Sequence, residues 1–182
     1  MKLMIASDLH GSAFYVEKLL SAMELEQPDK LILLGDLLYH GPRNDLPEGY
    51  APKKVIEMLS GIQNRVLSIR GNCEAEVDQM VLPFPVLNDY GVLFVDGITM
   101  YLIHGHKNMD MPVQKGDVIL SGHTHVPVLR EEQGIYYGNP GSVSIPKQNS
   151  VHGYLIYENG TLYHRGLTQG DLLPPLHIFK NV

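Results

Sequence analysis

The residues of this chain that could carry chemistry follow short apolar runs, at the places where buried strands would end. The runs LMIAS, LILLG, VLSIRG, MYLI and VILSG are each followed by a residue that can bind a metal ion. Because loops beyond the carboxyl ends of strands collect ligands in α/β sheets, residues distant in sequence can converge there. The candidate ligands are Asp8, His10, Asp36, Asn72, His104, His123 and His125.

The candidate set mixes carboxylate oxygen, amide oxygen and imidazole nitrogen. This mixture suits Mn²⁺, Fe²⁺, Zn²⁺ or Ni²⁺, whereas Ca²⁺ and Mg²⁺ prefer oxygen ligands. Seven ligands are too many for one such ion. If Asp36 bridges two ions, the two ligand shells are Asp8, His10, Asp36 and His125, and Asp36, Asn72, His104 and His123. Two ions about 3.5 to 4 Å apart activate a shared water and stabilise an in-line displacement, so phosphoryl transfer is the expected reaction class.

Each element of this set also has an ordinary structural explanation. Asp and His commonly end strands as caps, and Gly-Asp and Gly-Asn pairs are typical of turns. The pair His123 and His125 is more specific, because alternate residues of an extended chain project to the same side. The metal interpretation depends on all these residues taken together, because turn preference alone does not readily place residues able to bind metal at five strand ends.

The elements that must position these residues alternate strand, helix and strand in the first half of the chain. Amphipathic stretches of helical period lie at residues 14–23 and 55–59, between the first three apolar runs, and this order predicts an α/β sheet. After Cys73, Gly and Asn turns predict more antiparallel pairing, with Asn159-Gly160 as the strongest hairpin signal. The strand candidates in this half are residues 92–95, 99–103, 118–120, 135–137, 154–157 and 161–164.

Length and composition limit the classes of protein to consider. A chain of 182 residues with 44% apolar residues is expected to form one domain, residues 1–182. A net charge of -6 argues against an electrostatic grip on nucleic acid or on an anionic membrane. The longest apolar runs, such as residues 31–34, are far shorter than the roughly 20 residues of a membrane-spanning helix. With Cys73 as the single cysteine and two polar residues interrupting any N-terminal apolar core, a cytoplasmic location is expected.

In their order along the chain, these motifs resemble those of the calcineurin-like metallophosphoesterase superfamily, and the resemblance spans nearly the whole sequence. Longer strings are similar to those of small bacterial phosphodiesterases in that superfamily: HGPRN at 40–44, EGYAP at 48–52, RGNCE at 70–74, GHTH at 122–125 and NPGSVSIPK at 139–147. The resemblance implies an α/β fold, a four-layer αββα sandwich of two mixed β-sheets flanked by helices. It also implies a dinuclear Mn²⁺-type centre, bridged by Asp36, that hydrolyses small phosphodiesters through a metal-bound hydroxide.

The main departure from the superfamily pattern is Cys73. Much of the superfamily has a His after the residue equivalent to Asn72, placed to assist the leaving group. A thiol, with an ordinary pKa of about 8.5, is a poor general acid near pH 7, so we expect a preference for good leaving groups. The small bacterial members are similar in having Cys here, so this residue marks a subgroup. The expected catalytic residues are Asp36, Asn72 and Cys73.

Substrate contacts are expected from the loop that follows Asp36. Arg43 could pair with a phosphate group in bidentate fashion, and Asn44 lies beside it in a Gly-Pro loop, although a surface turn is the alternative explanation. With Cys73, these two are the expected substrate-binding residues. The loop at residues 139–142 is expected to support His123 and His125 from behind, because Pro and Gly set turn geometry without supplying ligands.

The expected function is that of a metal-dependent phosphodiesterase with two divalent transition-metal ions, Mn²⁺ first, with Zn²⁺, Fe²⁺ or Ni²⁺ as alternatives. A phosphomonoesterase or nuclease with the same site is one alternative, and the acidic composition argues against the nuclease. A non-catalytic interaction module with this fold, like a subunit of the retromer sorting coat, is another, and the intact ligand set argues against it. Apolar residues at 172–179 could pack on the domain itself or on a second copy, and the oligomers to consider are a homodimer and a homotetramer.

Overall fold

The computed structural model describes residues 1–179. The strands of one sheet are β1 (Lys2–Ala6), β2 (Lys30–Leu33), β3 (Val66–Ser68), β9 (Gly153–Glu158), β10 (Thr161–Gly166) and β11 (Leu176–His177). Those of the second sheet are β4 (Tyr90–Val95), β5 (Ile98–Ile103), β6 (Val118–Leu120), β7 (Pro127–Glu132) and β8 (Ile135–Pro140). The helices are α1 (Ala13–Glu26), α2 (Pro52–Gly61) and α3 (Glu76–Val81), with a 3₁₀ turn at Gln63–Arg65.

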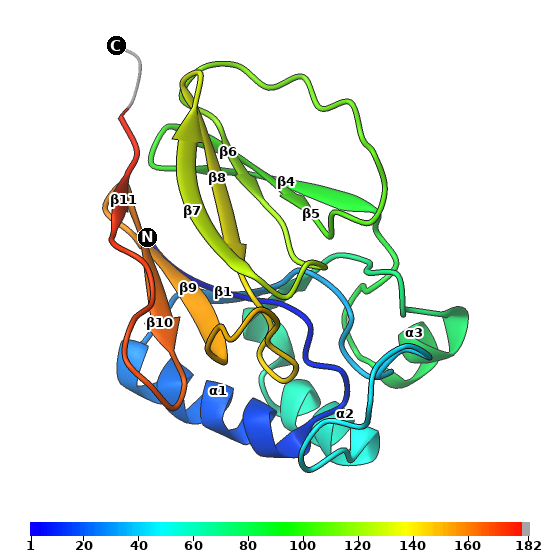
Figure 1. Cartoon of the computed structure of the whole chain (residues 1–182). Coiled ribbons are helices and arrows are strands. Elements are labelled where there is room, and N and C mark those ends of the chain that lie inside the picture. Colours follow the sequence, from blue (N-terminus) through cyan, green and yellow to red (C-terminus); the bar gives the residue numbers. More distant parts are fainter. Residues whose placement is uncertain (180–182) are drawn as a thin grey trace.

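The two sheets are mixed and pack face to face. The first has the strand order β11-β10-β9-β1-β2-β3 and the second β4-β5-β6-β8-β7. Figure 1 shows α1 and α2 against the side of the first sheet that faces away from the second, with α3 beside the strand ends. The predicted sandwich of two mixed sheets flanked by helices is confirmed.

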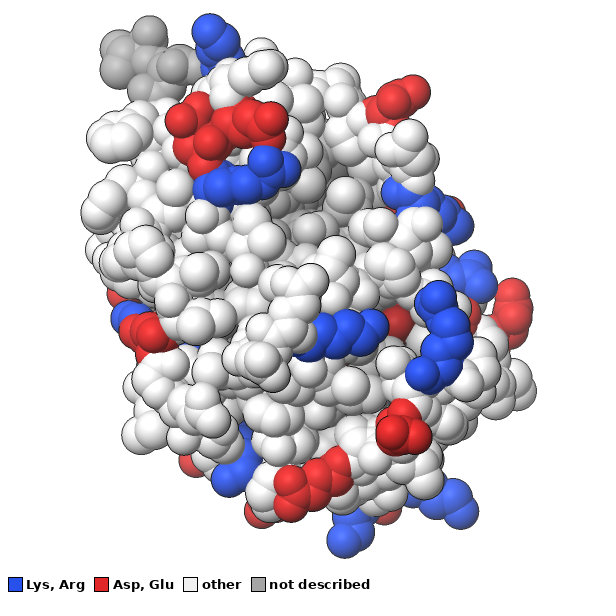
Figure 2. Space-filling view, in the orientation of Figure 1, with Lys and Arg blue, Asp and Glu red and all other residues white. Residues whose placement is uncertain are grey.

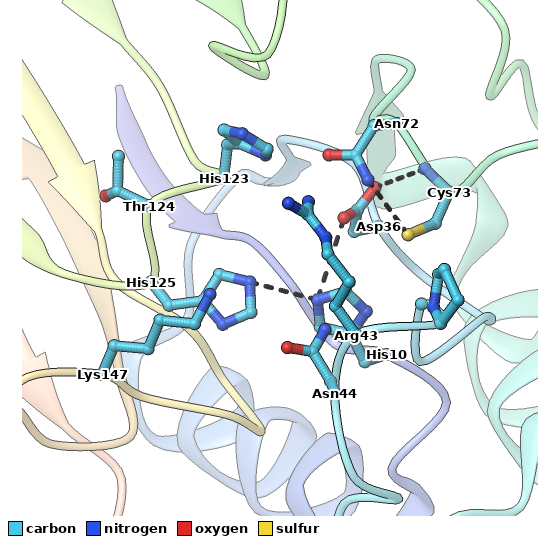
Figure 3. A pocket seen from close by; sticks show the side chains of 12 residues that line it. His10, Asp36, Arg43, Asn44, Asn72, Cys73, His123, Thr124, His125 and Lys147 are labelled. Atoms are coloured by element: carbon cyan, nitrogen blue, oxygen red, sulfur yellow. Dashed lines mark hydrogen bonds and ion pairs between the residues drawn. The ribbon is translucent and has the colours of Figure 1, made fainter.

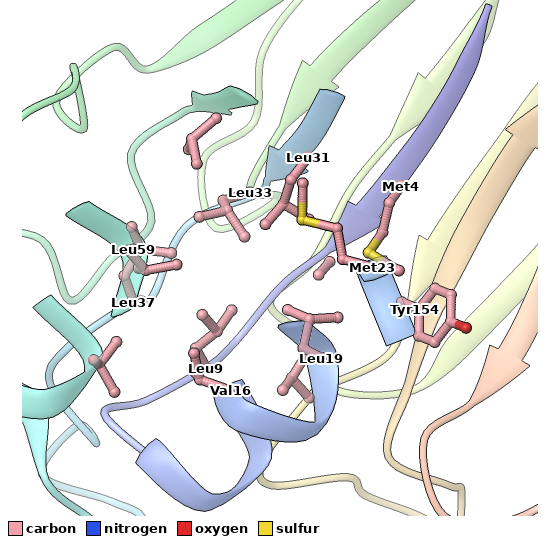
Figure 4. Close-up of a cluster of buried hydrophobic side chains, with 14 of the residues drawn as sticks. Met4, Leu9, Val16, Leu19, Met23, Leu31, Leu33, Leu37, Leu59 and Tyr154 are labelled. Atoms are coloured by element: carbon pink, nitrogen blue, oxygen red, sulfur yellow. The ribbon is translucent and has the colours of Figure 1, made fainter. Parts of the chain in front are cut away.

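Strand alternation divides the apolar side chains between two cores. In β1, Leu3 and Ile5 pack between the two sheets, whereas Met4 and Ala6 pack under the helices. Successive strand residues point to opposite faces, so a strand covered on both faces reads as one continuous apolar run. This is why the runs of β1 and β2 carry no polar alternation, whereas the run of the edge strand β3 includes Ser68 and leaves Leu67 exposed. Figure 4 shows the helix-side core, in which Leu19 and Met23 of α1 meet side chains of the sheet.

The pairing pattern brings several strand ends to one edge. β1, β2 and β3 run parallel, as do β5 and β6 in the second sheet. Their carboxyl ends therefore lead into neighbouring loops. The predicted hairpin between β9 and β10 is confirmed, and its turn residues Asn159 and Gly160 have φ of 50° and 75°, as a two-residue turn of this kind requires.

Three features differ from the sequence expectation or were missed by it. β7 has the sequence PVLREE, and its second half is exposed at the sheet edge, so no apolar pattern marked it. The short helix α3 was also missed. In residues 1–179, no helix covers the outer face of the second sheet, where Tyr90, Val92 and Phe94 remain partly exposed. The loop after β5 lies over this face, so the fourth layer is not helical.

No helix in the described range has the length and apolarity needed to cross a membrane. The assignment of residues 1–182 to one domain stays a prediction, because its last three residues lie outside the described range.

Candidate metal centre

The loops at the carboxyl ends of five strands supply the predicted ligands, and the structure brings all seven together. Asp8 and His10 follow β1, Asp36 follows β2 and Asn72 follows β3. His104 follows β5, and His123 and His125 follow β6. Figure 3 shows the pocket over these loops, with the histidine rings and Asp36 turned toward its centre.

Asp8, His10 and His125 form one group at the base of the pocket. The Nε2 atoms of the two histidines lie 3.2 Å apart, and Asp8 Oδ1 lies 3.2 Å from that of His125 and 3.6 Å from that of His10. His10 Nδ1 donates to the carbonyl of Tyr39 at 2.8 Å, and His125 Nδ1 donates to that of Ile145 at 2.6 Å. Each ring therefore carries a hydrogen on Nδ1 and directs Nε2 at its neighbours.

His104, Asn72 and Asp36 form a second group. His104 Nδ1 donates to the carbonyl of Leu34 at 2.6 Å, which leaves its Nε2 3.1 Å from Asn72 Oδ1 and 3.5 Å from Asp36 Oδ2. The amide nitrogen of Asn72 donates to Cys73 Sγ at 3.3 Å, so its oxygen is the atom presented to this group. Nitrogen and oxygen acceptors again face one another.

Asp36 lies between the two groups. Its Oδ2 is 3.5 Å from His104 Nε2 and 3.8 Å from His10 Nε2, while its Oδ1 accepts a hydrogen bond from the backbone N–H of Cys73 at 2.8 Å. The ring of His123 lies beside that of His104, with a centroid distance of 5.1 Å. A carboxylate in this position can contact cations in both groups.

The residues present fit metal ions. Asp8 is fully buried, and its Oδ1 has no hydrogen-bond partner within residues 1–179. Without a metal, protons must compensate: burial lowers the pKa of His104, but its hydrogen bond to Asp36 and the charges of Asp8 and Asp36 raise it to about 9. Two groups, Asp8-His10-His125 and Asp8-Asp36-His104, each place ligand atoms within 4.8 Å of one another. A divalent ion in either group would satisfy acceptors that otherwise need protons.

The backbone at these positions is unfavourable for ordinary residues. Five of the seven residues have left-handed φ angles, namely Asp8 at 57°, His10 at 45°, Asp36 at 57°, His123 at 66° and His125 at 59°. A non-glycine residue in this region is uncommon and costs on the order of 1 kcal/mol. The strain is concentrated where side chains must point into one space, which is typical of a functional site.

Two glycines in the motifs allow neighbouring loops of the site to lie close together. A Cβ atom on Gly71 would collide with Asp36, and one on Gly122 would collide with Ser7. Neither glycine has a positive φ, so the turn explanation given for Gly71 from sequence is replaced by a steric one. The loops that bear Asn72 and His123 can approach the aspartates only because these positions lack side chains.

Glu74 is a structural residue of the site that the sequence interpretation missed. Its buried carboxylate accepts backbone hydrogen bonds from Asp36 at 2.9 Å, Leu37 at 2.7 Å and Gly71 at 2.5 Å. It thereby joins the loop after β2 to the loop after β3. Its only signal in the sequence was its place in the string RGNCE, and nothing local indicated a contact with residues nearly forty positions away.

The loop at residues 139–142 lies behind the candidate ligands, where it was expected, and the residues that follow it, up to Ile145, continue there. Ser142 Oγ donates to the carbonyl of Asp8 at 2.7 Å, and the side chain of Asn139 donates to the carbonyl of Gly122 at 2.8 Å. The carbonyl of Ile145 accepts the hydrogen bond from His125 described above. The loop therefore sets ligand orientation from outside the pocket.

The pocket has a volume of about 490 Å³ and includes the predicted substrate residues Arg43, Asn44 and Cys73. Asn44 is partly occupied in its own loop, because its side-chain nitrogen donates to the carbonyl of His40 at 2.8 Å. The pKa of Cys73 is raised far above its usual range, first by burial and then by the adjacent Asp36 carboxylate, so the thiol stays neutral. Two further lining residues, Thr124 and Lys147, were missed.

The chain is similar to known phosphoesterases in both sequence and structure. Residues 1–161 match the calcineurin-like phosphoesterase superfamily domain. Phosphodiesterase YfcE of Escherichia coli K12 is 43% identical over 166 residues, covering 89% of this chain and 90% of YfcE. The solved structure of E. coli YfcE, a phosphoesterase, superimposes with a TM-score of 0.94 at 41% identity, covering 98% of this chain and all of that one.

A more distant likeness concerns the fold alone. Vps29 of Entamoeba histolytica, solved in complex with zinc, has a TM-score of 0.63 at 18% identity, covering 97% of this chain and 99% of that one.

The chain belongs to the calcineurin-like phosphoesterase superfamily. The family resemblance predicted from the motifs is confirmed, and so is the prediction of a metal-dependent phosphoesterase that uses divalent metal ions.

Proposed function

We propose that this protein is a phosphodiesterase with a dinuclear centre that acts on small phosphodiesters. One observation carries the proposal: histidine Nε2 atoms and carboxylate oxygens converge in two adjoining buried groups, and Asp36 Oδ2 lies between them, 3.8 Å from His10 Nε2 and 3.5 Å from His104 Nε2. The similarity to phosphodiesterase YfcE supports diester over monoester substrates. Under the proposal, one ion is held by Asp8, His10, Asp36 and His125, and the other by Asp36, Asn72, His104 and His123.

When bound, two such ions would activate water at neutral pH and stabilise charge on the phosphoryl oxygens. The protein's own residues complete the reaction. Arg43 and Asn44 lie at the pocket rim, where Arg43 can hold a phosphoryl oxygen. The thiol of Cys73 stays protonated, but its raised pKa makes it too weak an acid to protonate the departing group efficiently, so that group must be stable without protonation. This supports a preference for good leaving groups.

Manganese is the proposed metal, because the mixed oxygen and nitrogen ligands suit it and the family resemblance indicates it. Zn²⁺, Fe²⁺ and Ni²⁺ satisfy the same ligands. A cytoplasmic location and a homodimer or homotetramer also remain proposals from sequence.

The test uses metal-free protein and two chromogenic aryl phosphates, a diester and the matching monoester. We expect hydrolysis of the diester only after adding Mn²⁺ or another transition metal, and its loss in Asp36→Asn. The matched control is Asp110→Asn, which removes an exposed carboxylate outside the pocket. Preferred cleavage of the monoester would overturn the substrate class. Inactivity with every ion would instead favour the non-catalytic alternative.

A further inference from the structure

Lys147 lies at the rim of the pocket and has no role in holding the proposed metal ions. It is exposed and lines the same cavity as Arg43. Figure 3 shows its side chain running beside His125, while Arg43 enters from the opposite side. Figure 2 shows basic side chains on two sides of a hollow on this face of the molecule. The two cations therefore flank the space above the ligands.

The backbone of Lys147 is fixed relative to a candidate metal ligand. Its N–H donates to the carbonyl of His125 at 3.1 Å, and Ser150 Oγ donates to the carbonyl of Lys147 at 2.6 Å. The next two residues, Gln148 and Asn149, have φ of 55° and 57°, which closes a tight turn. The backbone of Lys147 thus holds the base of the side chain at a defined place beside His125.

Neither rim cation is neutralised by the protein. Within residues 1–179, no acidic side chain lies within ion-pair distance of Lys147 or Arg43, whereas every other arginine has a hydrogen-bond or ion-pair partner. Two unpaired cations face one cavity in a chain whose net charge is -6. The carboxylate that lines this cavity, Asp36, is used by the metal ions in the proposed function, so the two rim cations are left to face a ligand and suit an anionic one.

The charge exceeds what a simple diester needs. A phosphodiester group carries one negative charge at neutral pH, and in the proposed function that group lies on the metal ions with Arg43 beside it. The cavity of about 490 Å³ is within the range of sites that enclose a whole small molecule, so an ester substituent also fits. Lys147 is then available to a second anionic group on that substituent.

We propose that Lys147 forms a subsite for a second anionic group, so that the favoured substrates are phosphodiesters with a carboxylate or phosphate on one ester substituent. This inference rests on the proposed function. Lys147 acts as a point charge, which accepts either anion, and its contribution appears in binding of the substrate rather than in the chemical step.

Three aryl phosphodiesters with the same leaving group test the inference, one with a neutral second substituent, one with a carboxylate and one with a phosphate. We expect wild-type kcat/KM to be about tenfold higher for an anionic substrate than for the neutral one, mainly through KM. Lys147→Gln should abolish this ratio, Lys147→Arg should restore most of it, and Lys53→Gln, an exposed control on α2, should leave it unchanged. The two anionic substrates distinguish carboxylate from phosphate.

Binding provides a second readout without turnover. Calorimetry on the Mn²⁺-loaded protein measures the affinity for methylphosphonate, which has one anionic group, and for phosphonoacetate and methylenediphosphonate, which have a second. The ratio of the affinity for a compound with two anionic groups to that for methylphosphonate should be about tenfold smaller in Lys147→Gln than in wild type. If the anionic-to-neutral ratio of kcat/KM and the affinity ratio were each the same in wild type and Lys147→Gln, the inference would be overturned. Hydrolysis of the neutral diester in that case would leave the proposed function intact. Failure to hydrolyse any diester would instead contradict the proposed function, and the calorimetric comparison would still decide the role of Lys147.

Discussion

The Nε2 atoms of His10 and His125 lie 3.2 Å apart, and the Nδ1 atom of each ring donates a hydrogen bond to a backbone carbonyl. Two neutral rings in this arrangement would point lone pairs at each other, so the pair needs a cation nearby. Burial lowers the pKa of His10, but the ion pair with Asp8 raises it above its ordinary value. In the metal-free protein the raised pKa of His10 favours a proton at this place, and metal binding must displace that proton.

Metal binding should therefore release protons, and the release should depend on pH. With a pKa of about 9, His104 is almost fully protonated at pH 7.5 and loses its proton to bulk solvent as pH rises through 9. Calorimetric titration with Mn²⁺ in buffers of different ionisation enthalpy should show release at pH 7.5 that diminishes toward pH 10. His104→Gln should release less than wild type at pH 7.5. Heats that do not depend on the buffer would contradict this account.

Loss of Glu74 should destabilise the fold more than loss of an exposed glutamate. Glu74→Ala leaves three buried backbone N–H groups without an acceptor, and we expect a loss of about 3 kcal/mol in the free energy of unfolding. Urea denaturation in the presence of a chelator measures this without a contribution from metal. Glu57→Ala, an exposed position on α2, is the matched control and should change stability by less than about 0.5 kcal/mol. Equal stabilities of the two variants would show that the carboxylate does not join the loops.

The convergence of the candidate ligands was predictable because each follows an apolar run that ends a strand, and such runs have a strong local signature. The order of the motifs then identified the family, which supplied the sandwich. Glu74 was not predictable in the same way, since its partner Asp36 lies far away in sequence and an acidic residue near a strand end is usually solvated. Lys147 was missed because an exposed lysine is ordinary until the fold places it beside His125. Local sequence does not show which loops lie next to one another in the folded protein.

Cys73 should react slowly with alkylating reagents in the native protein. The thiolate is the reactive form, and burial and the charge of Asp36 raise the pKa of this thiol, so little thiolate forms at pH 8. An unperturbed cysteine with a pKa of about 8.5 would be roughly one quarter thiolate at that pH. Because Cys73 is the single cysteine and lines the open pocket, mass spectrometry after iodoacetamide treatment reads its reactivity directly. Reaction as fast as in urea-unfolded protein would show that the thiol is activated rather than suppressed.

His123 has a left-handed backbone, with φ of 66°. Substitutions at this position can therefore measure the strain of the backbone separately from the contribution of the imidazole to metal binding. Glycine adopts this conformation without penalty, whereas alanine does not, so His123→Gly should be more stable than His123→Ala by about 1 kcal/mol when both are metal-free. Both variants lack the imidazole and should bind Mn²⁺ more weakly than wild type. Thermal unfolding with and without Mn²⁺ measures both effects at once. A His123→Ala variant that is more stable than His123→Gly in chelator would contradict this prediction. It would mean that the backbone leaves the left-handed region once the ring is removed, so that the loop after β6 does not itself impose the strain.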